Sequence, residues 1–344
     1  MNRVMNELTP ETTVDYLHHR MLLPESVSAE VVALAWGVSN VVYRVTPSQG
    51  EVFVLKQSRR QLRTRDPWFS RLDRIWREAD VMRCLEPRLP PGVVPKVIFE
   101  DRENYLYTME AAPADHIVWK QRLLEGTAEE WIAGFLGTCL AALHRETAFR
   151  PDLCEQFGDV EVFRQLRVDP FYRRVADAHP GIDPWVDDLI ETMFAHRVCV
   201  VHADFSPKNV LVAGRRIVLV DYETGHYGDP AFDLGFFLSH LLLKSVLHRG
   251  QWSIFADLTR AFWKTYLDGI HSLSAHEEFS VNSLLKRVSQ HLAGCMWARI
   301  DGTSKIDYLP ALEDQRLVRE FCRDLLLNPA GDWEEILGRL ALKL

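Results

Sequence analysis

The hydrophobic positions divide the chain into a β-rich first part and a helix-rich second part. Valine, leucine and aromatic residues dominate three short runs at residues 30–36, 40–45 and 51–56, and two more at residues 94–99 and 105–109. Such runs, bounded by turn residues, are typical of strands. Helical periodicity covers residues 72–85, between the third run and the fourth. The predicted order is three strands, a helix and two strands.

Helices predominate after residue 112. Helical spacing recurs over residues 129–144, 182–196, 232–248, 252–270, 277–299, 311–327 and 333–342, and β pattern in this part is confined to residues 198–221. Near the N-terminus, Thr9, Pro10 and Glu11 predict a helix start, and the helix runs to about residue 20. We therefore predict a helical extension over residues 1–24, a β-rich lobe over residues 25–111 and a helical lobe over residues 112–344.

Composition narrows the class of protein. A chain of 344 residues with 47% hydrophobic residues is expected to bury a large core, and a net charge of -8 argues against a nucleic-acid surface. The six cysteines form no C-x-x-C pair, which favours reduced thiols in the cytoplasm and argues against zinc. The sequence begins without the apolar core of a signal peptide, and no apolar run reaches the length of a membrane span. We expect a cytoplasmic protein with no membrane or nucleic-acid partner.

The segment HADFSPKN at residues 202–209 carries the candidate chemistry. A strand, a turn at Gly214 and a second apolar strand follow it, and the second strand ends at Asp221. This hairpin is expected to bring Asn209 beside Asp221, and their oxygens are ligands that Mg²⁺ accepts. Asp204 is then placed to take the proton from a hydroxyl that attacks phosphorus. Polar loop residues often only cap turns, but H-x-D-x4-N followed by a hairpin and an Asp matches the catalytic loop of kinases.

The β-rich part should then supply a lysine for nucleotide phosphates. Lys56 lies at the end of the third predicted strand, where kinases carry that lysine, and Glu78 of the next helix is placed to pair with it. An edge-strand lysine and a solvent-facing acid are the alternative interpretations of these two residues. There is no G-x4-G-K-[ST] motif, so the sequence does not predict a P-loop nucleotide site.

Further nucleotide contacts are predicted from the main chain. Ser39 and Asn40 join the first two strands, where their N–H groups could meet phosphate, although Gly37 is the single glycine of this loop. Met109 and Ala111 lie at the junction between the two parts. In a bilobal kinase-like fold, the backbone at this junction would bond the edge of adenine.

These segments resemble the aminoglycoside phosphotransferase and choline kinase-like family, the small-molecule relatives of protein kinases. The resemblance covers about residues 10–330 and is most specific at residues 200–235, including DPAFDLG. It implies an α+β, bilobal protein kinase-like fold, with ATP and Mg²⁺ as cofactors and a small-molecule hydroxyl as acceptor. It also implies that Asp233 supports the 202–209 loop, with a helix N-cap as the alternative role. We expect His202 to brace this loop and Glu223 to assist a second metal ion or its waters.

Several segments are similar to the methylthioribose kinase branch of this family. They are residues 55–57, Trp68 with residues 72–74, residues 78–79 and residues 295–300. Two departures argue against methylthioribose itself as the substrate. Ala298 and Arg299 stand where that branch carries paired arginines, and the DYETG segment that begins at Asp221 lacks a tryptophan that the branch carries there. Arg299 is interpreted as a substrate contact, with a surface or helix-capping arginine as the alternative.

Three functions remain open at this point. The first is a kinase for a sugar, an amino alcohol or a similar metabolite, and the second is an aminoglycoside-modifying resistance enzyme. The third is a pseudokinase, which should have lost at least one of four residues that this chain keeps: Lys56, Asp204, Asn209 and Asp221. The sequence leaves open which hydroxyl is phosphorylated, the choice between ATP and GTP, and the oligomeric state.

Overall fold

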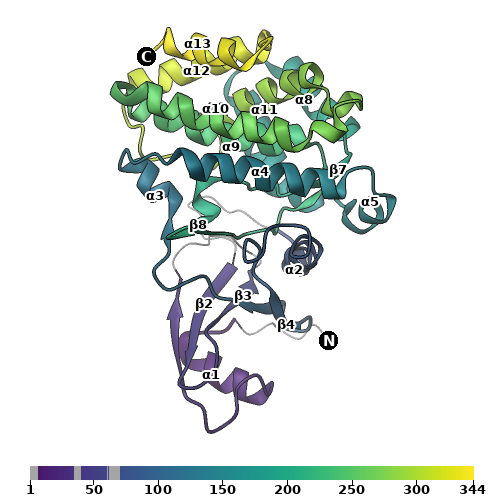
Figure 1. Ribbon diagram of the computed structural model, residues 1–344, viewed down its shortest axis with the longest axis vertical. Coiled ribbons are helices and arrows are strands. Elements are labelled where there is room, and N and C mark those ends of the chain that lie inside the picture. Colours follow the sequence, from purple (N-terminus) through teal and green to yellow (C-terminus); the bar gives the residue numbers. More distant parts are fainter. Residues whose placement is uncertain (1–6, 35–39, 60, 62–69) are drawn as a thin grey trace.

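The computed structural model describes residues 7–34, 40–59, 61 and 70–344. A β-sheet lobe, which ends at Glu110, and a helical lobe follow each other along the longest axis of the molecule (Figure 1). This is the predicted α+β, bilobal architecture. Ser39, Gly37 and Trp68, which the sequence analysis singled out, lie outside the described residues.

The sheet of the first lobe has five antiparallel strands in the order β1-β2-β3-β5-β4. The strands are β1 (Ala29–Ala33), β2 (Asn40–Pro47), β3 (Phe53–Ser58), β4 (Val97–Asp101) and β5 (Leu106–Glu110). Helix α2 (Arg74–Leu85) lies between β3 and β4 in the chain. Strand β3 is central, and all its residues are buried, as expected where both faces of a sheet are covered. The five strands and the helix confirm the predicted order.

Helix α1 (Pro10–His19) packs on β1, at the end of the molecule farthest from the helical lobe (Figure 1). The side chain of Thr9 accepts from the amide of Thr12, and the side chain of Thr12 accepts from the amide of Thr9. This reciprocal capping box, with Pro10 in the first turn, confirms the predicted helix start. Leu17 of α1 joins Leu55 of β3 in a second, smaller hydrophobic core of this lobe.

The helical lobe is organised around α9 (Pro230–Leu247). Helix α9 packs against α10 (Trp252–Gly269) and α11 (Val281–Asp301), and α10 packs against α4 (Glu130–Thr147) (Figure 1). Among the described residues α9 is the one helix long and apolar enough to span a membrane, but 94% of it is buried inside the protein. That burial identifies α9 as the core helix of this lobe.

Shorter helices and the outer helices complete this lobe. They are α3 (Trp119–Leu124), α5 (Pro151–Phe157), α6 (Glu161–Phe163), α7 (Arg174–Ala178), α8 (Asp183–Ala195), α12 (Leu312–Leu327) and α13 (Trp333–Ala341). All seven helical stretches predicted after residue 112 are confirmed, whereas α3, α5, α6, α7 and a π-helical segment at Arg164–Arg173 were not predicted. The six cysteines are free, and five of them are buried.

Short strands hold the 202–209 loop. Strand β7 (Cys199–Val201) pairs with β10 (His226–Gly228), and β8 (Val210–Ala213) pairs with β6 (Ile117–Val118) and β9 (Arg216–Leu219). The β8–β9 hairpin turns at Gly214, whose φ of 56° is readily adopted by glycine. The prediction that β structure is confined to residues 198–221 was wrong, because β6 and β10 are too short to show a period. The loop therefore runs from β7 to β8, and Asp221 follows β9.

Candidate active site

Asp204 and Asn209 contact each other across one tight turn. A 3₁₀ turn at Pro207–Asn209 folds the loop back on itself. Asn209 Nδ2 then donates to the Oδ2 and to the main-chain oxygen of Asp204, both at 2.9 Å. The amide of Val220 donates to the carbonyl of Asn209 at 3.1 Å. The turn is thereby joined to the residue that precedes Asp221, so the two ends of the predicted hairpin do meet.

Asp233 fixes the backbone of the 202–209 loop through hydrogen bonds. Its buried carboxylate accepts from the amides of His202 and Ala203, each at 2.7 Å, and lies 3.3 Å from His144 Nε2. Ala203 has a φ of 58°, in the left-handed region that non-glycine residues seldom adopt. His202 Nδ1 accepts from the amide of Asp204 at 3.2 Å. Burial raises the pKa of Asp233, but the bonds and charges of His144 and His202 outweigh it and hold the pKa below its usual range.

The alternative role of Asp233 as a helix N-cap is wrong. Helix α9 begins at Pro230, and its N-cap is Asp229, which accepts from the amide of Ala231 at 2.9 Å. Asp233 lies within the first turn of the helix instead. Its carboxylate is therefore available to the two loop amides.

Lys56 links the two lobes at this point. Its Nζ lies 2.8 Å from Glu78 Oε1 on α2 and 2.8 Å from Asp221 Oδ1 after β9. Glu78 Oε1 also accepts from the amide of Tyr222 at 3.2 Å. Lys56 and Glu78 are 5% and 1% exposed, so the solvent-facing interpretations of both residues are wrong. Lys56 and Asp221 lie 165 positions apart in the sequence. The buried ammonium group of Lys56 thus holds the two segments together.

Neighbouring charges favour the ionised forms of Lys56 and Asp221. Burial lowers the pKa of Lys56, but the charges of Asp221 and Glu78 outweigh it and hold that pKa well above its usual range. Burial raises the pKa of Glu78 to about 7, against the opposing effect of Lys56. Partial burial also opposes ionisation of Asp221, yet the charges of Lys56 and Lys208 lower its pKa. At neutral pH Lys56 is a stable cation and Asp221 a stable anion.

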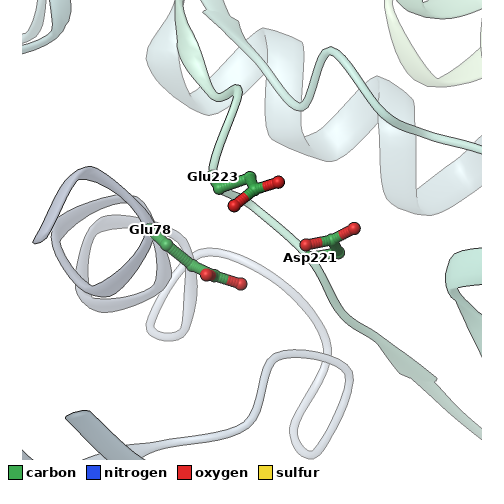
Figure 2. Close-up of side chains that lie close together, drawn as sticks. All are labelled: Glu78, Asp221 and Glu223. Atoms are coloured by element: carbon green, nitrogen blue, oxygen red, sulfur yellow. The ribbon is translucent and has the colours of Figure 1, made fainter. Parts of the chain in front are cut away.

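Glu223 adds a third carboxylate to this cluster. Figure 2 shows Glu223 and Asp221 on one loop segment, close to Glu78 of α2. One carboxylate oxygen of each residue lies within 4.8 Å of the others. Glu223 Oε2 accepts from Arg74 Nε at 3.1 Å and from Asn40 Nδ2 at 2.8 Å. The side chain of Asn40 therefore contacts this carboxylate cluster. Arg74, which is fully buried, was not predicted as a site residue.

The donor set suits a hard divalent cation. Mg²⁺ takes carboxylate and amide oxygens. Asn209 directs its amide nitrogen to Asp204, so its amide oxygen is the end offered elsewhere. Asp221 is partly exposed and binds Lys56 through one oxygen only, and Glu78 Oε2 is buried with no hydrogen-bond partner among the described residues. The residues present therefore fit a magnesium ion.

Two cations hold the carboxylate of Asp204. Arg167 Nη2 lies 2.8 Å from its Oδ1, and Lys208 Nζ lies 2.8 Å from its Oδ2. Arg167 Nε also donates to the carbonyl of Ala203 at 2.9 Å. Arg167 was missed because it lies in the π-helical segment Arg164–Arg173, which contains Pro170 and shows no helical period. The cations orient the carboxylate and leave its position little freedom.

Met109 and Ala111 lie where the sheet lobe ends. Met109 belongs to β5 and pairs with Val54 of β3 and Val97 of β4. Ala111 directly follows β5 and is half-buried. The predicted adenine-binding residues therefore lie where the sheet lobe ends and the chain passes to the helical lobe.

Arg299 lies on α11, in a pocket beside the 202–209 loop. It shares this pocket with Lys208, and its Nη1 donates to Ser304 Oγ at 2.9 Å. The other polar residues of the pocket were missed by the sequence analysis; they are Lys120, His240, Lys244 and Tyr308. A signal for two of them was present, because His240 and Lys244 interrupt an otherwise apolar helical stretch.

Comparison with known sequences finds matches to phosphotransferases. The profile of the phosphotransferase enzyme family matches residues 30–276. Methylthioribose kinase of Citrobacter koseri is 25% identical over 250 residues, which cover 63% of this chain and 61% of that protein. Methylthioribose kinase of a Geobacillus species is 21% identical over 91% of this chain and 88% of that protein. The chain thus spans about three fifths of the Citrobacter relative that it matches.

Comparison with solved structures concerns the fold alone. An amicoumacin kinase in complex with AMP-PNP, Ca²⁺ and Ami has a TM-score of 0.50 and 15% identity, over 96% of this chain and all of that chain. Macrolide 2'-phosphotransferase of Brachybacterium faecium has a TM-score of 0.52 and 18% identity, over 94% of this chain and all of that chain. The predicted bilobal kinase-like fold is confirmed.

Proposed function

Because the chain belongs to the phosphotransferase enzyme family, we propose that it transfers the γ-phosphoryl group of ATP to a hydroxyl of a small molecule. One arrangement carries the proposal. The Asp204–Asn209 pair lies on the loop that precedes the β8–β9 hairpin, and Asp221, which follows this hairpin, forms an ion pair with Lys56 of β3. A proton acceptor, a magnesium-binding pair and a phosphate-binding cation are the groups that this reaction needs.

The family implies ATP as the phosphoryl donor. In the proposed site Lys56, positioned by Glu78, contacts the phosphates of ATP. Asn209 and Asp221 would hold Mg²⁺, with Glu223 supplying a further oxygen for a second ion or its waters. When bound there, Mg²⁺ would neutralise negative charge that develops on the phosphates during transfer.

Asp204 is the proposed catalytic residue. Its carboxylate accepts the proton of the acceptor hydroxyl as the hydroxyl oxygen attacks phosphorus. Arg167 and Lys208 orient this carboxylate through contacts of 2.8 Å. His202 and Asp233 are positioning residues, because they fix the backbone that carries Asp204. Most of the rate acceleration then comes from positioning and from fixed charges.

The remaining roles complete the proposal. The backbone of Met109 and Ala111 binds the adenine edge, and Ser39 and Asn40 border the phosphates. Residues 25–111 form the nucleotide-binding lobe, residues 112–344 carry the loop and the acceptor pocket, and residues 1–24 form an N-terminal extension. The protein is proposed to act in the cytoplasm on a small molecule, without a nucleic-acid or membrane partner.

The test is the appearance of a phosphate ester. Purified protein is incubated with MgATP and pools of sugars, hydroxy acids, sugar phosphates, amino alcohols and aminoglycosides, and ³¹P NMR follows the products. A new phosphomonoester that forms together with ADP, and only when Mg²⁺ is present, is the expected result. Failure of the protein to bind MgATP, or ADP formation that is independent of every acceptor, would contradict the proposal.

A further inference from the structure

A pocket of positive charge lies beside the 202–209 loop. Its lining includes no acid and four cationic side chains: Lys120 of α3, Lys208, Lys244 of α9 and Arg299 of α11. The pocket is partly open to solvent. Lys208 also lies 2.8 Å from the Oδ2 of Asp204. A molecule in this pocket would therefore lie next to the proposed catalytic carboxylate.

Lys244 is a buried lysine without an ion pair to any described residue. Its side chain is wholly inside the protein, and its Nζ donates to the carbonyl of His240 at 3.0 Å and to Tyr308 Oη at 3.4 Å. Burial, and then the charges of Lys120 and Arg299, lower the pKa of Lys244 well below its usual range. An ammonium group in such surroundings is costly unless an anion is near it.

Two neighbours of Lys244 carry unpartnered polar atoms. His240 is 8% exposed, and its Nε2 is buried with no hydrogen-bond partner in the described part of the chain. The same holds for Nε of Arg299. Buried polar atoms in native proteins are nearly always bonded to protein or to water. Donor-rich, unsatisfied groups around a cavity indicate a ligand that brings acceptor oxygens.

Resting on the proposed phosphotransfer, we propose that the acceptor substrate carries an anionic group, a carboxylate or a phosphate, which binds Lys120, Lys244 and Arg299 while its hydroxyl faces Asp204. The pocket favours this class because every charged side chain in its lining is positive. Asp307 influences Lys120 electrostatically but does not line the pocket. Aminoglycosides and amino alcohols carry positive charge and would be repelled.

A binding test reports on the pocket without turnover. Thermal unfolding is measured with inorganic phosphate or acetate added, in the presence of Mg²⁺ and AMP-PNP to fill the nucleotide site. Phosphate or acetate should raise the Tm of the wild type and of Lys264→Met, a control whose exposed ammonium pairs with Asp268. Neither anion should raise the Tm of Lys244→Met or Arg299→Met. Equal shifts in all four proteins would overturn the proposal. A larger rise in Tm with phosphate than with acetate would indicate a phosphate group on the acceptor, and a larger rise with acetate would indicate a carboxylate.

A turnover test separates the acceptor class from the reaction. Glycerol, glycerate and glycerol 3-phosphate offer similar hydroxyls with no charge, a carboxylate and a phosphate, and ribose with ribose 5-phosphate offers a second set. An anionic member should be phosphorylated with a kcat/KM at least about tenfold above its neutral partner, the factor expected for one charge-assisted hydrogen bond. Lys244→Met should abolish this preference by raising KM. Phosphorylation of only neutral or cationic acceptors would overturn the proposal of an anionic acceptor and leave the kinase proposal intact. Failure of the wild-type protein to bind MgATP would overturn the kinase proposal itself.

Discussion

Replacement of Asp233 by asparagine tests how the 202–209 loop is held. The carboxylate of Asp233 accepts from the amides of His202 and Ala203 at 2.7 Å and contacts His144 at 3.3 Å. Asparagine has one acceptor oxygen, so its amide nitrogen would face one of the two loop amides. A charge-assisted bond worth about 1.5–3 kcal/mol is lost, and a buried amide is left unpaired at a further ~1–3 kcal/mol. We expect Asp233→Asn to lower the free energy of unfolding by about 2.5–6 kcal/mol, a large share of the roughly 5–15 kcal/mol typical of a folded protein.

Urea unfolding, followed by tryptophan fluorescence and circular dichroism, measures this change. Asp268→Asn is the matched control: its side chain is 65% exposed and pairs only with Lys264 among the described residues, so its effect should stay within about 0.5 kcal/mol. In folded Asp233→Asn, kcat should fall about a hundredfold with little change in the KM for ATP, because Asp204 is displaced while Lys56 is not. An Asp233→Asn protein with wild-type stability and kcat would refute the supporting role.

Two more predictions concern the metal site and pH. Asp221→Ala should abolish Mg²⁺-dependent nucleotide binding in calorimetry, since it removes a proposed Mg²⁺ ligand that also pairs with Lys56; unchanged affinity in the presence of Mg²⁺ would contradict this. Burial lowers the pKa of His226 to about 4, so the unfolded chain, with a pKa near 6.5, binds the proton first and stability falls as pH drops from about 6.5 to 4, by roughly 3 kcal/mol. His226→Gln should flatten the decline between pH 7 and pH 5 in urea titrations, and a variant with the wild-type slope would assign the decline to other groups.

Local sequence patterns predicted the helices and strands whose apolar side chains recur at a regular spacing. Residues 311–327 repeat apolar side chains at helical spacing, and they form α12 with almost the predicted limits. The three strands before Lys56 were predicted because β-branched and aromatic residues fill them. Strands β6 and β10 have two and three residues, and such lengths show no period. Their positions are decided by pairing with β8 and β7, which is a tertiary effect.

The sequence places some residues of the candidate site together, but not others. Asp204 and Asn209 could be placed together because one turn joins them, and Lys56 and Glu78 because the kinase order of strand and helix fixes their relation. Arg167 contacts Asp204 from 37 positions earlier in the chain, with no motif to connect the two. Lys120, Lys244 and Arg299 come from three helices, so only the packed lobe brings their charges to one pocket.

The central claim is that Asp204 accepts a proton during transfer, and one measurement tests it most directly. The affinity for MgATP by calorimetry and the single-turnover rate of phosphoryl transfer are determined on the same samples of wild type and Asp204→Asn, with an acceptor found in the ³¹P NMR panel. Loss of a general base should reduce the rate by about 10²–10⁴-fold and leave the affinity for MgATP within about threefold. A rate close to that of the wild type, or a parallel loss of rate and MgATP binding, would contradict the assignment of Asp204 as the catalytic base.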